Sequence, residues 1–189
     1  MNPTRILIAV SAVWVGCEIL LMFLKRSGKD TSRQDRGSMT ALWVTIAASC
    51  FLGGFAASVS ATRMPRGIRI YAFFGGLALI VLGFALRLAA IFTLRRYFTV
   101  DVAIAKDHKV IDTGLYGIVR HPSYVGSFIS FLGLGLAFVN WLSLAIVVIG
   151  PTIAFAYRIR IEERALIDAL GDEYRAYAAR TKRFIPGVF

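Results

Sequence analysis

The apolar residues of the chain fall into long blocks, which are separated by short stretches rich in charged and polar residues. Blocks of about twenty residues match a hydrocarbon core roughly 30 Å thick, because each helical residue rises about 1.5 Å. The pattern predicts membrane-spanning helices near 4–24, 40–61, 70–92, 123–139 and 141–157. Only Asn140 and Trp141 interrupt the last two blocks, which are short, so we expect them to form a tight helical hairpin.

Composition supports this interpretation. The 189 residues are 57% hydrophobic, and their mean hydropathy of +0.67 is too high for an ordinary soluble domain of this length. The first block runs directly into Lys25 and Arg26 and lacks the small-residue exit of a cleaved signal peptide, so we interpret it as a retained span. The predicted fold class is an all-α integral membrane protein with five transmembrane helices.

Lysine and arginine are distributed unevenly over the connections between the blocks. Seventeen of them fall in 25–39, in 93–122 and from Arg158 onward, on one side of the membrane, whereas Arg5 and three residues in 62–69 fall on the other side. Because cytoplasmic connections carry the excess of cations, this bias predicts an outside N-terminus and a cytoplasmic C-terminus.

Other kinds of function find little support. The net charge of +11 could indicate nucleic-acid binding, but the cations cluster at the ends of apolar blocks, where anionic lipid headgroups and topology account for them. Cys17 and Cys50 lie inside apolar blocks without a neighbouring ligand, and only His108 and His121 are available as histidine ligands. We therefore expect no metal site, no disulfide, no nucleic-acid partner and no obligate protein partner.

Arg87 is the single cation that remains after Arg5 and the connections are counted, it lies inside the third block, and it has two interpretations. It either reaches the interface by snorkelling or faces the interior of the bundle in a functional role. Gly76, Gly83 and Arg87 share one helical stripe, which would turn Arg87 inward. The fourth block also carries small residues at helical spacing that would let another helix approach closely, namely Gly126, Ser130, Gly133 and Ala137.

Candidate chemistry begins at residue 112. The segment 112–126 reads Asp-Thr-Gly-Leu-Tyr-Gly-Ile-Val-Arg-His-Pro-Ser-Tyr-Val-Gly and lies directly before the fourth span. Pro122 suits the first turn of a helix, so Arg120 and His121 would lie at its positive N-terminal end, a position that suits an anionic ligand group. An ordinary interfacial belt would explain Arg120, Tyr116 and Tyr124 singly, but it explains less well their concentration with other polar residues.

The fifth block continues as an amphipathic helix to Gly171, a stop signal. Glu163 falls on its apolar stripe, so this carboxylate either pairs with Arg160 or Arg164 or faces a cavity. Glu162 is less distinctive, because Arg158 precedes it by four residues and could pair with it.

A second short helix is expected from about Asp172, with Tyr174 and Tyr177 on one side. We interpret it as a cytoplasmic, interfacial helical lid.

In order and spacing, residues from about 95 to 189 resemble the isoprenylcysteine carboxyl methyltransferase family and its phospholipid methyltransferase relatives. The resemblance rests on the run from Arg120 to Gly126, on Gly114 and Tyr116 ahead of it, and on a C-terminal series made of Glu162, Glu163, Leu166, Leu170, Gly171, Tyr174, Tyr177, Arg183 and Pro186. It divides the chain into a three-span region at 1–92 and a catalytic region at 93–189.

The resemblance implies an S-adenosylmethionine pocket between the last two spans and the C-terminal helices, with a lipid-like acceptor reaching it from the bilayer. The residues that it assigns to the cofactor are Gly114, Tyr116, His121, Tyr124, Glu162 and Glu163. Arg120 and Arg183 match arginines placed near the acceptor carboxylate. Such residue types suit the cofactor, which combines a sulfonium cation, an amino-acid end and a ribose.

Three alternatives stay open at this point. An amine acceptor, as in phospholipid N-methylation, would need a base such as His121 or a glutamate. Membrane sterol and steroid reductases also place an Arg-His-Pro-x-Tyr run before a late span, but they require an arginine-rich site for the 2′-phosphate of NADPH. A structural membrane protein would carry its charges for topology alone. The paired glutamates favour a cationic cofactor, and the two flanking arginines favour carboxyl methylation over amine methylation.

Overall fold

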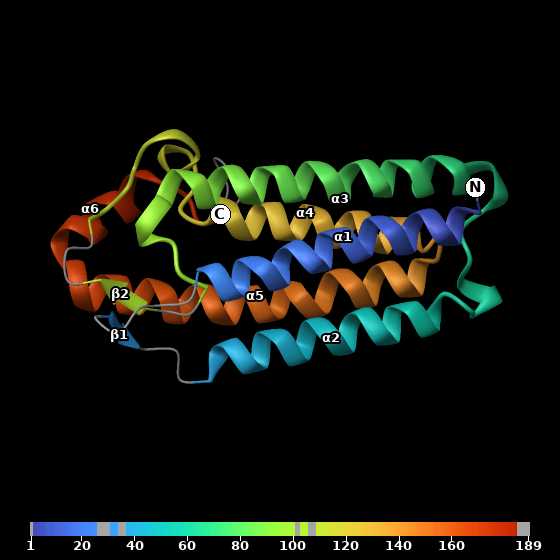
Figure 1. Cartoon of the computed structure of the whole chain (residues 1–189), viewed down its shortest axis with the longest axis horizontal. Coiled ribbons are helices and arrows are strands. Elements are labelled where there is room, and N and C mark those ends of the chain that lie inside the picture. Colours follow the sequence, from blue (N-terminus) through green and yellow to red (C-terminus); the bar gives the residue numbers. More distant parts are fainter. Residues whose placement is uncertain (1, 26–30, 34–36, 101–102, 106–108, 185–189) are drawn as a thin grey trace.

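The computed structural model describes residues 2–25, 31–33, 37–100, 103–105 and 109–184. Six α-helices make up most of this structure: α1 (Pro3–Leu24), α2 (Ser38–Ala56), α3 (Arg66–Leu94), α4 (Pro122–Ala137), α5 (Trp141–Leu170) and α6 (Asp172–Arg180). Helices α1 to α5 run along the long axis of the molecule, and α6 lies at the end opposite the N-terminus (Figure 1). The protein is thus a helical bundle, as its apolar blocks predicted.

Four of these helices are long and apolar enough to cross a membrane: α1, α2, α3 and α5. Helix α4 is apolar but has only 16 residues. The predicted boundaries agree to within a few residues for α1, α3 and α4, whereas α2 ends at Ala56, before the predicted 61. Helix α5 continues thirteen residues past the end of the predicted span at 157, and its end at Leu170 confirms the predicted amphipathic continuation to Gly171.

Three short 3₁₀ turns and one small β-ribbon connect the helices. The turns are η1 (Ser60–Thr62), η2 (Arg95–Tyr97) and η3 (Gly114–Gly117). Strands β1 (Thr31–Arg33) and β2 (Ala103–Ala105) pair antiparallel, with Ser32 opposite Ile104. The predicted all-α fold did not include this ribbon, since three-residue strands carry too little alternation to be recognised.

Helices α3 and α4 form the closest contact in the bundle. A Cβ atom on Gly76 would lie 2.5 Å from the backbone oxygen of Gly133, and one on Gly83 would lie 2.5 Å from that of Gly126. The predicted stripes of small residues are therefore confirmed as a helix–helix interface, in which glycine lets the two backbones touch. Ser130 strengthens this contact by donating its hydroxyl to the carbonyl of Ile80 at 3.2 Å.

The turn between α4 and α5 is held by Asn140. Its side-chain oxygen accepts from the N–H groups of Leu142 and Ser143 at 2.9 and 3.1 Å, which caps α5. Its amide nitrogen donates to the carbonyl of Val59 at 3.0 Å, so the connection between α2 and α3 is tied to the same turn. The expected tight hairpin is present and is fixed by one fully buried polar side chain.

Candidate functional site

A cavity of about 760 Å³ runs through the bundle. At one end its lining includes Pro3, Ala57 and Val139, near the α4–α5 turn, and at the other end it includes Tyr174 and Tyr177 of α6. This volume lies in the range of small-molecule and cofactor sites. Its middle is lined by apolar side chains of α1, α2 and α4, among them Leu7, Ile46 and Phe131.

The end of the cavity beside α6 is polar. Side chains with hydrogen-bonding groups line it, among them Tyr116, Arg120, His121, Tyr124, Glu162, Tyr174 and Tyr177. Helix α4 begins at Pro122, so His121 is its N-cap residue and is buried there. Tyr124 donates its hydroxyl to Glu162 Oε2 at 3.0 Å, which joins α4 to α5 across this end of the cavity.

Glu163, the neighbour of Glu162, lies in a different environment. Its Oε1 accepts from Arg120 Nε at 3.0 Å and lies 3.3 Å from His121 Nε2, while its Oε2 accepts from Arg183 Nε at 2.9 Å. Two guanidinium groups beside one carboxylate favour its ionised form. Glu163 is buried but does not line the cavity, and its partners are not Arg160 or Arg164.

Arg120 connects this cluster with the segment after α6. Its Nη1 donates to the carbonyl of Ala178 at 2.7 Å and to that of Thr181. Its backbone N–H donates to the carbonyl of Lys182 at 2.7 Å, beside a parallel bridge between Val119 and Lys182. The segment that precedes α4 is therefore fastened to the segment that follows α6, beside the polar end of the cavity.

Tyrosine hydroxyls add neutral donors to this end. Burial raises the pKa of Tyr177 to about 12 and, together with nearby carboxylates, raises the pKa of Tyr116 and Tyr174 further. Tyr177 donates to the carbonyl of Tyr116 at 2.7 Å. These hydroxyl groups stay protonated at physiological pH and can donate to a ligand or to the backbone.

The predicted site residues separate into two groups. Five of them line the cavity: Tyr116, Arg120, His121, Tyr124 and Glu162. Gly114 lies at the start of η3 with a φ of +58° and does not line the cavity, and neither do Glu163 and Arg183. Pro186, the last residue of the C-terminal series, lies outside the described residues.

The expected pairing of Glu162 with Arg158 does not describe the main contacts of either residue. Arg158 is 2% exposed, lines the cavity and donates to Ser38 Oγ at 2.7 Å and to the carbonyl of Val100 at 2.6 Å. Arg158 was not among the predicted site residues. A basic residue four positions before a carboxylate suggested an ordinary surface pair, whereas its position at the inner end of an apolar span was the signal for burial.

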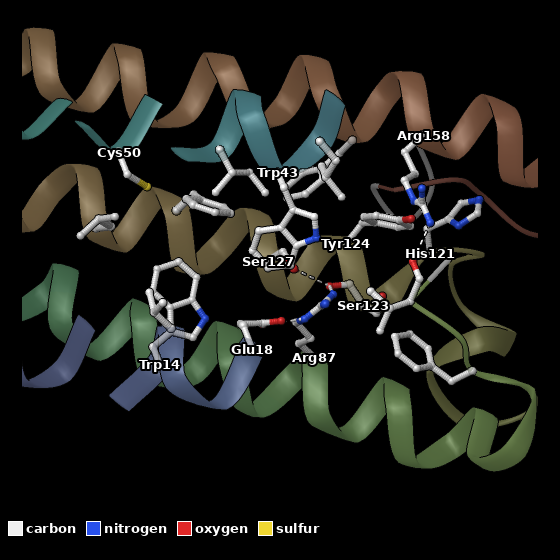
Figure 2. Close-up of a pocket in the computed structure, with 18 of the residues that line it drawn as sticks. Trp14, Glu18, Trp43, Cys50, Arg87, His121, Ser123, Tyr124, Ser127 and Arg158 are labelled. Atoms are coloured by element: carbon white, nitrogen blue, oxygen red, sulfur yellow. Dashed lines mark hydrogen bonds and ion pairs between the residues drawn. The ribbon is translucent and has the colours of Figure 1, made fainter. Parts of the chain in front are cut away.

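Arg87 also lines the cavity, and its orientation is now clear. Its Nε lies 2.7 Å from Glu18 Oε1 of α1, and both side chains are largely buried, so Arg87 faces the interior (Figure 2). This orientation is one of the two interpretations of Arg87 given above, but its pairing with Glu18 was not predicted. Each is the only charged residue in the middle of its span, and two opposite charges inside a membrane favour pairing.

Several buried polar atoms on the cavity wall have no hydrogen-bond partner among the described residues. They are Ser11 Oγ, Trp14 Nε1, Trp43 Nε1 and Tyr174 Oη. A buried polar group without a partner costs roughly 1–3 kcal/mol. Their location in the lining of one cavity indicates that the cavity takes a ligand with polar atoms.

The fold and the cavity together define an integral membrane protein with a ligand cavity inside its helical bundle, polar at one end and apolar along the rest. Comparison with known proteins gives the family. Residues 76–168 match the model of the isoprenylcysteine carboxyl methyltransferase family. The resemblance drawn from the motifs is thereby confirmed, and this part of the chain belongs to that family.

Curated relatives and a solved structure agree with this family. The chain is 37% identical over 115 residues to protein-S-isoprenylcysteine O-methyltransferase B of Arabidopsis thaliana. This match covers 60% of the chain and 58% of the relative. It is 33% identical over 146 residues to protein-S-isoprenylcysteine O-methyltransferase of Schizosaccharomyces pombe. That match covers 72% of the chain and 62% of the relative.

A eukaryotic intramembrane Ras methyltransferase of solved structure, an isoprenylcysteine carboxyl methyltransferase, superposes with a TM-score of 0.59 at 27% identity. This match covers 80% of the chain and 51% of the solved protein. The chain thus spans only about half to three fifths of the length of these relatives.

Proposed function

We propose that the protein transfers a methyl group from S-adenosylmethionine to the carboxylate of a lipid-like acceptor of the isoprenylcysteine type. One observation carries the proposal: a single cavity joins a polar end, rich in tyrosine and bearing Glu162, to a long apolar section inside the membrane bundle. A polar cofactor and a lipid tail can therefore occupy one space. The relatives that match the chain are named for this reaction.

The residues at the polar end fit the proposed cofactor. Glu162 offers a carboxylate to an amine or to ribose hydroxyls, and Tyr174 offers a hydroxyl group that lacks a partner among the described residues. Tyr116, Tyr124 and Tyr177 offer aromatic faces beside a cation. When bound, S-adenosylmethionine would supply an electrophilic methyl group on a sulfonium. Gly114, which lies apart from the cavity, would act by shaping the turn that carries Tyr116.

The arginines of the cavity wall suit an anionic acceptor. Arg87, Arg120 and Arg158 line the cavity, and a guanidinium group can orient a carboxylate through two parallel hydrogen bonds. A carboxylate with an ordinary pKa near 4 is already ionised at neutral pH, so no general base is needed. We propose that these residues align the acceptor and that a cavity filled by both ligands excludes water, effects worth several kcal/mol.

Arg183 is proposed to act indirectly. Its guanidinium contacts Glu163 and not the cavity, and Glu163 in turn holds Arg120 and His121. We propose that Arg183 and Glu163 are positioning residues, which fix two residues of the cavity wall from behind.

The finer features of the fold extend this proposal. Helix α4, about 24 Å long by its rise per residue, would be a fifth span lying between α3 and α5. We propose that α6 covers the cofactor end on the cytoplasmic side, as the distribution of cations predicts. Residues 1–92 would supply the membrane region and 93–189 the cofactor site, although α1, α2 and α3 also contribute to the cavity wall.

A methyl-transfer assay tests the proposal. Purified protein in detergent, supplied with S-adenosylmethionine carrying a radiolabelled methyl group, is offered a prenylcysteine, a fatty acid and a phospholipid. We expect base-labile ester label on the prenylcysteine. S-adenosylhomocysteine should bind at micromolar strength, and Glu162→Gln should weaken that binding, whereas Asp168→Asn on the exposed side of α5 should not. Label confined to phospholipid amines would favour N-methylation, and preferential binding of NADPH would contradict methyl transfer.

A further inference from the structure

An ion pair lies within the membrane-spanning part of the cavity wall. Glu18 is the only acidic residue of α1, and its Oε1 lies 2.7 Å from Arg87 Nε of α3. The two side chains are only 15% and 14% exposed, and they point toward one another in Figure 2. Arg87 Nη1 also lies 3.5 Å from the carbonyl of Ser123, in the first turn of α4. The pair therefore lies beside the polar end of the cavity.

Unpartnered donors lie in the same part of the cavity. The indole N–H groups of Trp14 and Trp43 and the hydroxyl of Ser11 are buried, line the cavity and lack hydrogen-bond partners among the described residues. Figure 2 shows both indoles in the part of the cavity that contains Glu18 and Arg87. A donor-rich wall with one cation suits a ligand that brings oxygen acceptors. This observation is independent of the ion pair and indicates that polar ligand atoms reach this region.

Helix α1 is held to the bundle by few contacts. Trp14 is its only buried residue and packs edge to face on Phe131 of α4, with ring centroids 5.1 Å apart. Helix α4, by comparison, buries ten of its 16 residues. The Glu18–Arg87 pair is therefore a main attachment of α1, and α1 can move away from the cavity more easily than α4 can.

We propose that Glu18 substitutes for the carboxylate of the acceptor: it occupies Arg87 while the cavity lacks an acceptor, and the acceptor's carboxylate displaces it. This inference rests on the proposed function. Both pairs consist of one guanidinium and one carboxylate, so the exchange keeps the charge on Arg87 balanced. The displaced Glu18 lies six residues before Leu24, about 9 Å from the end of α1, and its side chain can turn toward the interface beside Lys25.

Methylation would reverse the exchange. As the oxygen–carbon bond to the methyl group forms and the sulfur–carbon bond breaks, the acceptor's carboxylate becomes a neutral ester. A neutral ester cannot match the ionised Glu18 as a partner for Arg87. Glu18 then returns to Arg87 and favours release of the product, so the ion pair distinguishes the acceptor from its ester.

Binding measurements with the acid and ester forms of one lipid test this exchange. S-farnesyl-N-acetylcysteine and its methyl ester are titrated into the purified protein saturated with S-adenosylhomocysteine, so no turnover occurs. Glu18→Gln removes the competing charge, and we expect the acid to bind about five- to tenfold more tightly. The affinity for the ester should change less than about twofold, because the ester does not compete with Glu18 for Arg87. Glu18→Asp, which shortens the side chain by one methylene, should also raise the affinity for the acid, but by a smaller factor.

The control and the contrary outcomes are distinct. Cys17→Ser lies beside Glu18 but outside the cavity lining, and it should leave both affinities unchanged. Two outcomes would contradict the exchange: the affinities for acid and ester change by the same factor, or both Glu18 variants bind the acid more weakly. Glu18 would then only compensate the charge of Arg87, and the proposal of methyl transfer would be unaffected. If the wild type binds neither S-adenosylhomocysteine nor the lipid, the proposed function fails and the exchange fails with it.

Discussion

Glu162 and Glu163 are consecutive residues of α5, yet one faces the cavity and the other faces away from it. Glu162 accepts the hydroxyl of Tyr124 within the cavity wall, whereas Glu163 contacts Arg120, His121 and Arg183 behind it. A helix turns by about 100° per residue, so neighbouring side chains point in different directions. Substitutions of the two glutamates should therefore affect different properties of the protein.

Glu163→Gln should lower both stability and activity. The neutral amide removes the negative charge from the contacts that Glu163 makes with Arg120 and Arg183, and weakening these hydrogen bonds should cost about 1–3 kcal/mol of unfolding free energy. Methyl transfer should fall at least about tenfold, or ~1.4 kcal/mol, because Arg120 and His121 lose their position. Thermal denaturation in detergent and the methyl-transfer assay measure the two effects. Wild-type stability in this variant would contradict the role of Glu163.

Glu162→Gln should lower cofactor binding with little change in stability. The amide oxygen can still accept from Tyr124, so the link between α4 and α5 persists. The charge that would pair with a cationic amine is lost, and affinity for S-adenosylhomocysteine should fall about tenfold or more. Isothermal titration, with Asp168→Asn as the matched change on α5, measures this. An unchanged affinity would remove Glu162 from the cofactor site.

Tyr177→Phe should destabilise the protein by about 1 kcal/mol, because the hydrogen bond to the carbonyl of Tyr116 is lost. Burial raises the pKa of Tyr177 to about 12, above the value of about 10 in an unfolded chain. The native state thus favours the protonated hydroxyl, and its contribution is complete below about pH 10 and is lost as the pH rises toward 12. The difference in stability between wild type and variant should be constant from about pH 7 to 9 and smaller near pH 11 to 12. A difference that grew with pH would contradict this assignment.

Gly76→Ala and Gly75→Ala should have opposite outcomes although the residues are adjacent in α3. A Cβ atom at Gly76 would lie 2.5 Å from the oxygen of Gly133 and 2.7 Å from the nitrogen of Ala137, whereas one at Gly75 meets nothing within 4 Å. The first change should separate α3 from α4 and cost about 1–3 kcal/mol. The second should be neutral or slightly stabilising. Thermal denaturation of the two variants compares them directly, and equal stabilities would exclude close backbone contact at Gly76.

The sequence predicted best those features that depend on local pattern. Apolar length located the helices, small-residue spacing located the α3–α4 contact, and Gly171 marked the end of α5 with a φ of +55°. It predicted five residues of the cavity wall, because Arg120, His121 and Tyr124 lie together at one helix start.

Contacts between distant segments were harder to predict. The partners of Glu163 are 20 to 43 residues away, so helical spacing pointed to the wrong arginines. Arg158 and Glu18 depend on how α1 and α2 pack around the cavity, and nothing in a single sequence fixes that packing.

Backbone contact between α3 and α4 makes one side of the bundle stiff. Gly83 and Gly126 leave no slack there, since each would place a Cβ atom within 2.6 Å of the opposite backbone. A bulkier tail of the proposed acceptor must consequently be accommodated by α1, whose only buried residue is Trp14. Substitutions in α1 can then change which tails the proposed site accepts, while the groups around Tyr124 keep their positions.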